Sequence, residues 1–276
     1  MTTSPHVLPE VRNLKFAFDS EIPRDWHGGR QTITSFFNNL SVFFPAGEKF
    51  FIVSVKAHKQ FITEPRLVEE ARAFYSQEGI HSREHIRYND VLKSQGYPVQ
   101  AMEKRVDRLL RRVAWLIPVR KQLAVTSALE HFTALMAHLM LRDPKVLEGA
   151  HPVMAGLWRW HAAEENEHKA VAFDVYKAAG GTYIERCIVM VFATVIFWAK
   201  VFEHQVRLMH HDGTLFSFGE WRSLLSFLFV SPGAFRGLGA LYFDYFRPSF
   251  HPWDLDNRDL LDSWKQELAA SPAYTG

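Results

Sequence analysis

Apolar residues recur at spacings of three and four from Pro45 onward, with very few β-type alternations, and this periodicity is typical of α-helices. Helix-breaking residues such as Pro65, Pro118 and the Gly180-Gly181 pair separate the periodic segments. We also expect Ser231-Pro232-Gly233 to kink or split one of them. The pattern therefore predicts helices over 45–60, 65–95, 101–117, 119–141, 152–179, 182–211, 220–246 and 255–269.

The first 44 residues lack this periodicity. Pro5, Pro9, Pro23 and the pair Gly28-Gly29 interrupt it, so residues 1–44 are expected to form an irregular N-terminal leader. Residues 45–276 are expected to form a single helical domain, in which a bundle over 45–180 is followed by accessory helices over 182–276. The predicted fold class is all-α, a helical bundle with additional C-terminal helices.

Composition narrows the range of partners and compartments. A net charge of +2 over 276 residues gives no reason to expect a nucleic-acid partner. The single cysteine, Cys187, excludes an internal disulfide and a cysteine-rich metal site. This cysteine usage suits a reducing cytoplasm, and the stretch MTTSPHVLPEVRNLKF predicts no signal peptide. We therefore expect a cytoplasmic protein.

Two features keep peripheral membrane contact open as an alternative. The thirteen uncharged residues 187–199 fall short of the roughly 18 to 20 that cross a bilayer, so a buried core helix is the favoured interpretation. A second apolar stretch covers 224–246. The segment 103–116 predicts an amphipathic helix whose basic face is either solvated or directed at an anionic surface or an acidic substrate tail.

Two stretches concentrate histidine and glutamate on one helix face each. In WHAAEENEHKAVAFDVY, residues 160–176, the spacing places His161, Glu165 and His168 on one face. In YSQEGIHSREH, residues 75–85, it does the same for Glu78, His81 and His85. Each stretch contains a Glu-x-x-His pair, the arrangement that four-helix di-iron carboxylate proteins take from two of their helices.

A single Glu-x-x-His is a weak signal. The Glu and His content alone predicts about one by chance, and the chain contains three. The third, Glu148 with His151, precedes Pro152, which is expected to leave His151 outside the helix, so we exclude this pair.

The order of the whole set is more specific. Glu48 lies 30 residues before Glu78, and Glu130 lies 35 residues before Glu165. Both lone glutamates stand on otherwise apolar helices, where an unpaired carboxylate would be costly. Each Glu-x-x-His is thus preceded by a lone glutamate about one helix earlier, which predicts a metal site.

This doubled order resembles the ferritin-like di-iron carboxylate family. The added His161, four residues before Glu165, resembles the ligand pattern of the p-aminobenzoate N-oxygenase type. The stretches FFPAGEKFF, QEGIHSREH, WHAAEENEHKAVAFDVY and YFRPSFHPWD resemble a bacterial family described as predicted metal-dependent hydrolases. The resemblance implies a ferritin-like bundle that binds two metal ions, with Fe expected and Mn or Zn as alternatives.

Roles for the ligands follow from hard-metal chemistry. Glu78 and Glu165 are expected to bridge the two ions, and His85 and Glu164 are additional candidates. His85 either binds a metal or orients a ligand, and Glu164 either replaces or joins Glu165. Glu84 and Glu167 fall off the ligand face and are expected to form surface pairs. The expected metal ligands are Glu48, Glu78, His81, Glu130, His161, Glu165 and His168.

Three functions compete. The leading hypothesis is a di-iron oxidoreductase that uses O₂ and an electron donor to oxidise a small organic substrate. The many aromatic residues favour a hydrophobic substrate, such as an acyl chain or an aromatic amine. The first alternative is a dinuclear hydrolase in which a metal-bound hydroxide attacks the substrate. The second is a non-catalytic iron-binding or scaffold protein. A homodimer is left open.

Overall fold

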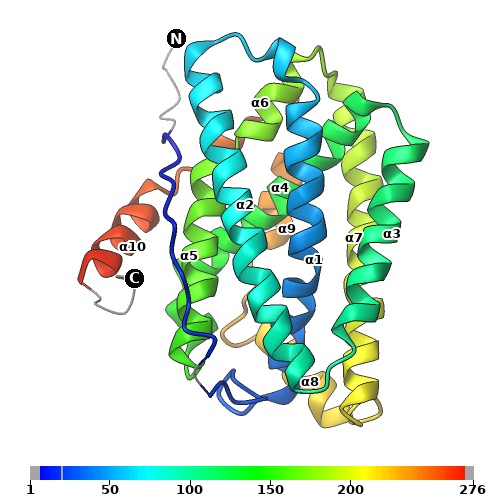
Figure 1. The fold of residues 1–276 in the computed structure, drawn as a ribbon, viewed down its shortest axis with the longest axis vertical. Helices are drawn as coiled ribbons and strands as arrows, with labels where there is room; N and C mark the ends of the chain where they lie inside the picture. The colour runs from blue at the N-terminus through cyan, green and yellow to red at the C-terminus, as the bar shows by residue number, and fades with distance from the viewer. Residues whose placement is uncertain (1–6, 20, 271–276) are drawn as a thin grey trace.

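The computed structural model of the protein describes residues 7–19 and 21–270, and these fold into an all-α helical bundle, as the sequence predicts (Figure 1). Short 3-10 turns lie at Lys59–Phe61, Pro144–Leu147 and Pro252–Asp254. The α-helices are α1 (Gln31–Lys56), α2 (Pro65–Ser94), α3 (Val99–Leu116), α4 (Val119–Arg142), α5 (Pro152–His168), α6 (Val171–Ala178), α7 (Tyr183–His211), α8 (Phe218–Phe229), α9 (Leu238–Asp244) and α10 (Arg258–Ala270).

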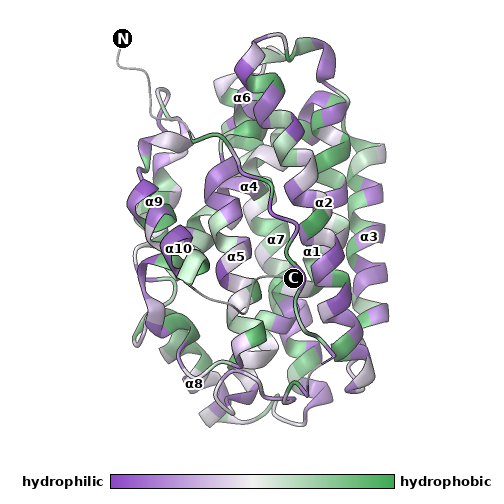
Figure 2. Cartoon of the chain, turned by 60° about the vertical axis from the view of Figure 1, so that its left-hand side comes forward, coloured by the Kyte–Doolittle hydropathy of each residue, from purple (hydrophilic) through white to green (hydrophobic). Residues whose placement is uncertain are grey.

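Two helical hairpins form the centre of the bundle. Helix α1 packs along α2, and α4 packs along α5, so that four long helices surround one core. Helices α3 and α7 cover one side of this core, where α3 packs on α1 and α7 packs on α4 and α1. In Figure 2, α3 carries hydrophilic and hydrophobic residues along the same helix, as its amphipathic sequence predicts.

The first helix begins at Gln31, so the expectation of an irregular leader up to residue 44 is wrong for its last third. Every residue from Thr32 to Val42 is buried, and a helix buried on all sides has no amphipathic pattern to reveal it. Pro45 lies inside the helix and cannot donate to the carbonyl of Ser41, which instead accepts a hydrogen bond from Asn89 Nδ2 at 3.4 Å.

Two other predicted helices are each split in the structure. The predicted helix 152–179 is two helices, because the chain turns at Lys169 and Ala170. Lys169 Nζ there donates to Leu255 O at 2.6 Å and Asn257 Oδ1 at 2.8 Å. The predicted helix 220–246 is split between α8 and α9 at Ser231-Pro232-Gly233, as expected. The exclusion of His151 from α5 is also confirmed.

The prediction that residues 187–199 form a buried core helix is only half correct. Met190 and Ala193 of α7 are buried, but Ile188, Phe192 and Val195 are exposed on the opposite side of the same helix. No helix in the described part of the chain has the length and hydropathy needed to span a membrane. The apolar character of α7 therefore has to be explained by something other than the core.

Candidate metal centre

Four helices direct acidic and histidine side chains into one buried cluster. Helix α1 supplies Glu48 and α4 supplies Glu130, while α2 and α5 each supply a Glu-x-x-His pair and one further histidine. Within each of four groups, potential ligand atoms lie within 4.8 Å of one another. The groups are Glu48–His85–His161, His81–His161–Glu165, Glu48–Glu78–His81 and Glu78–Glu130–His168. The fold thus brings all seven expected ligands together, with His85 beside them.

Three carboxylates of this cluster are buried without hydrogen bonds. Neither oxygen of Glu48, Glu78 or Glu130 has a hydrogen-bond partner in the part of the chain that the structure describes. Burial and the nearby Glu78 carboxylate raise the pKa of both Glu48 and Glu130 well above the usual range. Several acids that repel one another in a dry interior are costly unless a cation or protons neutralise them. The donor set therefore fits a cation.

The ring of His81 is held by a residue outside these groups. Its Nε2 donates to Glu164 Oε2 at 3.0 Å, and Glu164 Oε1 accepts a hydrogen bond from Trp160 Nε1 at 2.9 Å. His81 Nδ1 lies 3.7 Å from Glu165 Oε1 and has no hydrogen-bond partner within residues 7–19 and 21–270. A neutral imidazole that donates from Nε2 presents a lone pair at Nδ1, the form in which histidine binds metals.

His168 is oriented in the same way by Gln77. The Gln77 amide nitrogen donates to Glu167 Oε2 at 3.0 Å, so its oxygen accepts from His168 Nδ1, also at 3.0 Å. The remaining Nε2 of His168 has no hydrogen-bond partner among the described residues and lies 3.1 Å from Glu78 Oε1 and 3.4 Å from Glu130 Oε2. Burial lowers the pKa of His168, but the carboxylates of Glu130 and Glu165 outweigh it and raise this pKa well above its usual value.

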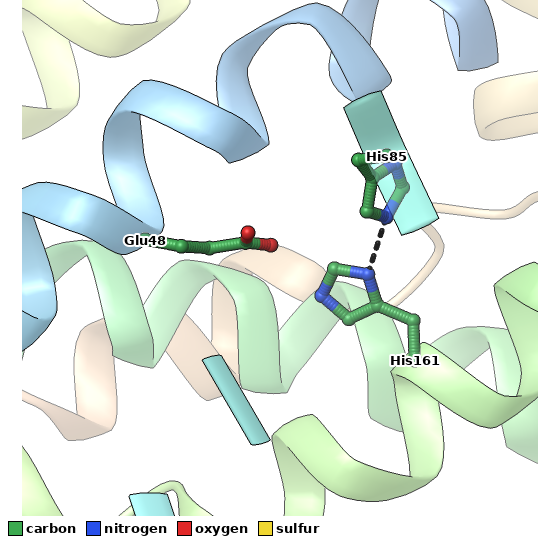
Figure 3. Close-up of side chains that lie close together, drawn as sticks. All are labelled: Glu48, His85 and His161. Atoms are coloured by element: carbon green, nitrogen blue, oxygen red, sulfur yellow. Dashed lines mark hydrogen bonds between the residues drawn. The ribbon is translucent and has the colours of Figure 1, made fainter. Parts of the chain in front are cut away.

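A chain of hydrogen bonds fixes His161 through His85 (Figure 3). The Ser41 hydroxyl donates to Asn89 Oδ1 at 2.8 Å and therefore accepts from His85 Nδ1 at 2.9 Å. His85 Nε2 is then free to accept from His161 Nδ1 at 2.6 Å. The other ring nitrogen of His161, Nε2, lies 2.8 Å from Glu165 Oε1.

Glu164 lies outside the four groups and supports His81 instead, in contrast to Glu165. The expectation that Glu84 and Glu167 form surface pairs is wrong, because both side chains are fully buried. Glu84 binds two arginines, Arg83 and Arg87, that lie partly at the surface. The helical spacing correctly predicts that these glutamates lie away from the candidate ligands. It does not predict which residues cover them.

Two residues that support the centre were missed at the sequence level. Arg12 pairs with Glu167 at 2.8 Å and with Glu164 at 3.3 Å, from a non-helical segment that gives no periodic signal. Gln77 precedes Glu78 and resembles any polar residue of an amphipathic helix. Its role depends on its contacts with Glu167 and His168 of α5, which cannot be predicted from the residues around Gln77.

The comparisons with known proteins agree with a metal centre. A family model described as "Predicted metal-dependent hydrolase" matches residues 10–256, nearly the whole chain. No curated protein and no solved structure matches the chain. Because the matched region includes all four bundle helices and every residue of the cluster, the chain belongs to this predicted metal-dependent hydrolase family.

Proposed function

We propose that the protein is a metalloenzyme that binds two metal ions among α1, α2, α4 and α5. One observation carries this proposal: ring nitrogens of His81, His161 and His168 lie 2.8–3.7 Å from carboxylate oxygens inside one buried cluster, and such imidazole and carboxylate groups are the ligands that these metal ions bind. Glu78 belongs both to the group with Glu130 and to the group with Glu48, so it is suited to bridge two ions.

Glu165 is the second proposed bridge. Its Oε1 lies 2.8 Å from His161 Nε2 and 3.7 Å from each of His81 Nδ1 and His168 Nε2, so it reaches the donors of both ions. Glu48 and Glu130 then complete the two coordination spheres from opposite sides. His85 is proposed to orient His161, because its Nε2 is the acceptor for the His161 Nδ1 proton.

We propose hydrolysis as the reaction, in line with the description of the family. Bound hard-metal ions would supply Lewis acidity and an activated water. The protein's own side chains keep other water out: Phe44 packs 4.4 Å from the His161 ring, Trp160 packs 4.8 Å from His81, and Phe74 packs 5.0 Å from His168. Glu164 and Gln77 hold the ring protons of His81 and His168 away from the ions.

Oxidation by O₂ is the second candidate. The order of lone glutamates and Glu-x-x-His pairs on four helices is the one used by di-iron carboxylate proteins, which supports a ferritin-like di-iron centre. Three histidines beside four carboxylates also favour iron as the metal. This candidate requires an electron donor and iron, whereas hydrolysis proceeds without O₂ and with Zn or Mn.

An anaerobic Fe(II) titration of metal-free protein, followed by exposure to air, tests the proposal. Saturation at two ions per chain is expected. No change of the near-ultraviolet spectrum in air, together with hydrolysis of a model ester by the Zn or Mn form, supports the hydrolase. A ferric absorption band that rises with O₂ supports the oxidoreductase instead.

Substitutions in the cluster test whether metal uptake depends on these residues. Glu130→Gln and Glu165→Gln should each reduce the metal content below two ions per chain. Glu148→Gln is the matched control, because Glu148 belongs to the excluded Glu-x-x-His pair and lies exposed outside the bundle helices. Unchanged metal content in both bundle variants would contradict the proposal.

A further inference from the structure

A large apolar groove lies on the outer side of the α1–α4 wall, between α3 and α7. Its volume is about 690 Å³, within the range of small-molecule sites. The polar side chains that line it are Lys121, Thr133, Thr182, Glu185 and Lys200, and the other lining residues are apolar or glycine. Neither the family description nor the proposed metal chemistry accounts for this groove.

The groove and the metal centre share a wall. Gly47 and Leu129 line the groove, and each is followed directly by one of the lone glutamates, Glu48 or Glu130. Phe44, which packs on His85 and His161, lines the groove as well. A ligand in the groove would therefore lie one layer of side chains from the ligand cluster.

Gly47 contributes no side chain to this wall. Glycine in the middle of a helix costs roughly 1 kcal/mol relative to alanine. No backbone conformation requires it, because Gly47 has no positive φ, and an added Cβ would meet only the ring of Phe51 at 3.9 Å. The missing side chain instead leaves space on the groove side of α1, next to Glu48.

The charges at the two ends of the groove differ. Lys200 donates to Glu203 at 2.6 Å. Among the described residues, the Lys121 ammonium forms no hydrogen bond or ion pair, and the nearby Glu185 is bound by Arg120 at 3.1 Å. Fifteen residues of α7 separate Glu185 from Lys200, about 22 Å of helix.

We propose that this groove binds a long-chain carboxylic acid, with its carboxylate at Lys121 and its hydrocarbon chain running between α3 and α7 past Gly47. An elongated apolar lining, with a cation near its end that forms no ion pair among the described residues, matches an amphiphile with a single chain and an anionic head. A peptide is disfavoured, because its backbone amides would lack partners there. The role of this acid as substrate rests on the proposed metalloenzyme function, but its binding does not.

The apolar residues at the mouth of the groove fit this ligand. Ile184, Ile188 and Phe192 of α7 line it and remain 69%, 52% and 65% exposed, so a hydrocarbon chain would cover them. This also explains why the apolar sequence of α7 is only half buried in the core.

Displacement of a fluorescent fatty acid by palmitate tests the proposal, with the metal content of each sample measured in parallel. One saturable site per chain is expected. Gly47→Leu should weaken binding by at least about tenfold, because the new side chain fills the groove. Gly79→Leu is the matched control, since Gly79 is a mid-helix glycine on the exposed side of α2 with no atom within 4 Å of an added Cβ.

The headgroup position is tested separately. Lys121→Gln should weaken palmitate binding by about tenfold and leave hexadecanol binding unchanged, whereas Lys200→Gln should change neither by more than about twofold. Equal binding by wild type and Gly47→Leu, or binding only to anionic phospholipid vesicles and not to free palmitate, would overturn the proposal. Two metal ions without palmitate binding would refute this inference alone, and palmitate binding without metal uptake would refute the proposed function alone.

Discussion

Glu164 and Glu165 are neighbours in sequence but have different surroundings in the centre. Glu165 Oε1 lies among three histidine nitrogens, whereas Glu164 accepts hydrogen bonds from His81 and Trp160. A helix turns by 100° per residue, so one of two adjacent glutamates enters the ligand face and the other supports it from behind.

This difference predicts unequal effects of two isosteric variants. Glu165→Gln should abolish binding of the second metal ion, because an amide cannot bridge two cations as a carboxylate does. Glu164→Gln should keep both ions but lower their affinity by about 10- to 100-fold, since the carboxyl group that orients the His81 ring is lost. Competition with a chromophoric chelator measures both affinities, and equal losses would contradict the assignment.

The clustering of the proposed ligands could be predicted from the sequence because their spacing obeys a local rule. Glu78 and His81 share a helix face whatever the helix packs against, and Glu165 and His168 do the same. The supporting contacts could not be predicted, since Gln77 reaches His168 across 91 residues of sequence. Sequence periodicity predicts which face of a helix a side chain occupies, but not which residues it contacts.

At the scale of elements, the N-terminal segment is part of the metal centre's support. Residues 7–19 run along α2 and α5, where the Glu10 amide donates to Glu167 and the Phe16 amide donates to Glu84 (Figure 1). Arg12 in this segment is 9% exposed and brings a positive charge to Glu167 and Glu164. The irregular segment therefore covers buried acids of α2 and α5 and adds hydrogen-bond donors and a cation to those that the helices supply.

Arg12→Met should destabilise the protein by about 3–5 kcal/mol, because Glu164 loses its cation and Glu167 keeps only the more exposed Lys265, at 3.3 Å. Urea unfolding monitored by circular dichroism measures the change. The matched control is Arg111→Met, since Arg111 and Asp107 form a pair on the exposed face of α3 and contribute at most about 1 kcal/mol. A loss of the same size in both variants would show that Arg12 has no special role.

Only the second half of helix α1 could be predicted from the sequence. Its second half is predicted because apolar residues recur at spacings of three and four from Pro45 onward. Its first half is buried on all sides and includes the polar residues Asn38, Asn39 and Ser41. Each of these polar side chains forms a hydrogen bond with a distant partner, such as Val201 O for Asn39 Nδ2 at 2.7 Å. The sequence of such a segment has no amphipathic pattern, so its helix cannot be predicted without knowing which elements pack around it.

At the scale of the whole molecule, several buried histidines outside the metal centre remain neutral in the fold. Burial is the main cause that lowers the pKa of His27, His138 and His204 to about 4 and that of His131 to about 3. An unfolded chain titrates these groups near pH 6.5. Between those values the unfolded state binds protons that the folded state rejects, so the fold should lose stability as the pH falls from 6.5 toward 4.

His204 allows this prediction to be isolated. Its ring is fully buried 4.9 Å from that of Phe43, and neither nitrogen has a hydrogen-bond partner among the residues that the structure describes. With a folded pKa of about 4, it should remove about 2 kcal/mol of unfolding free energy between pH 7 and pH 5. His204→Phe keeps the aromatic contact and removes the titration, so its loss over the same interval should be smaller than that of wild type by this amount. Urea unfolding of both metal-free proteins at the two pH values measures the difference, in which the contributions of the other histidines cancel. Parallel losses would mean that His204 is solvated or protonated in the folded protein, contrary to its position between α1 and α7.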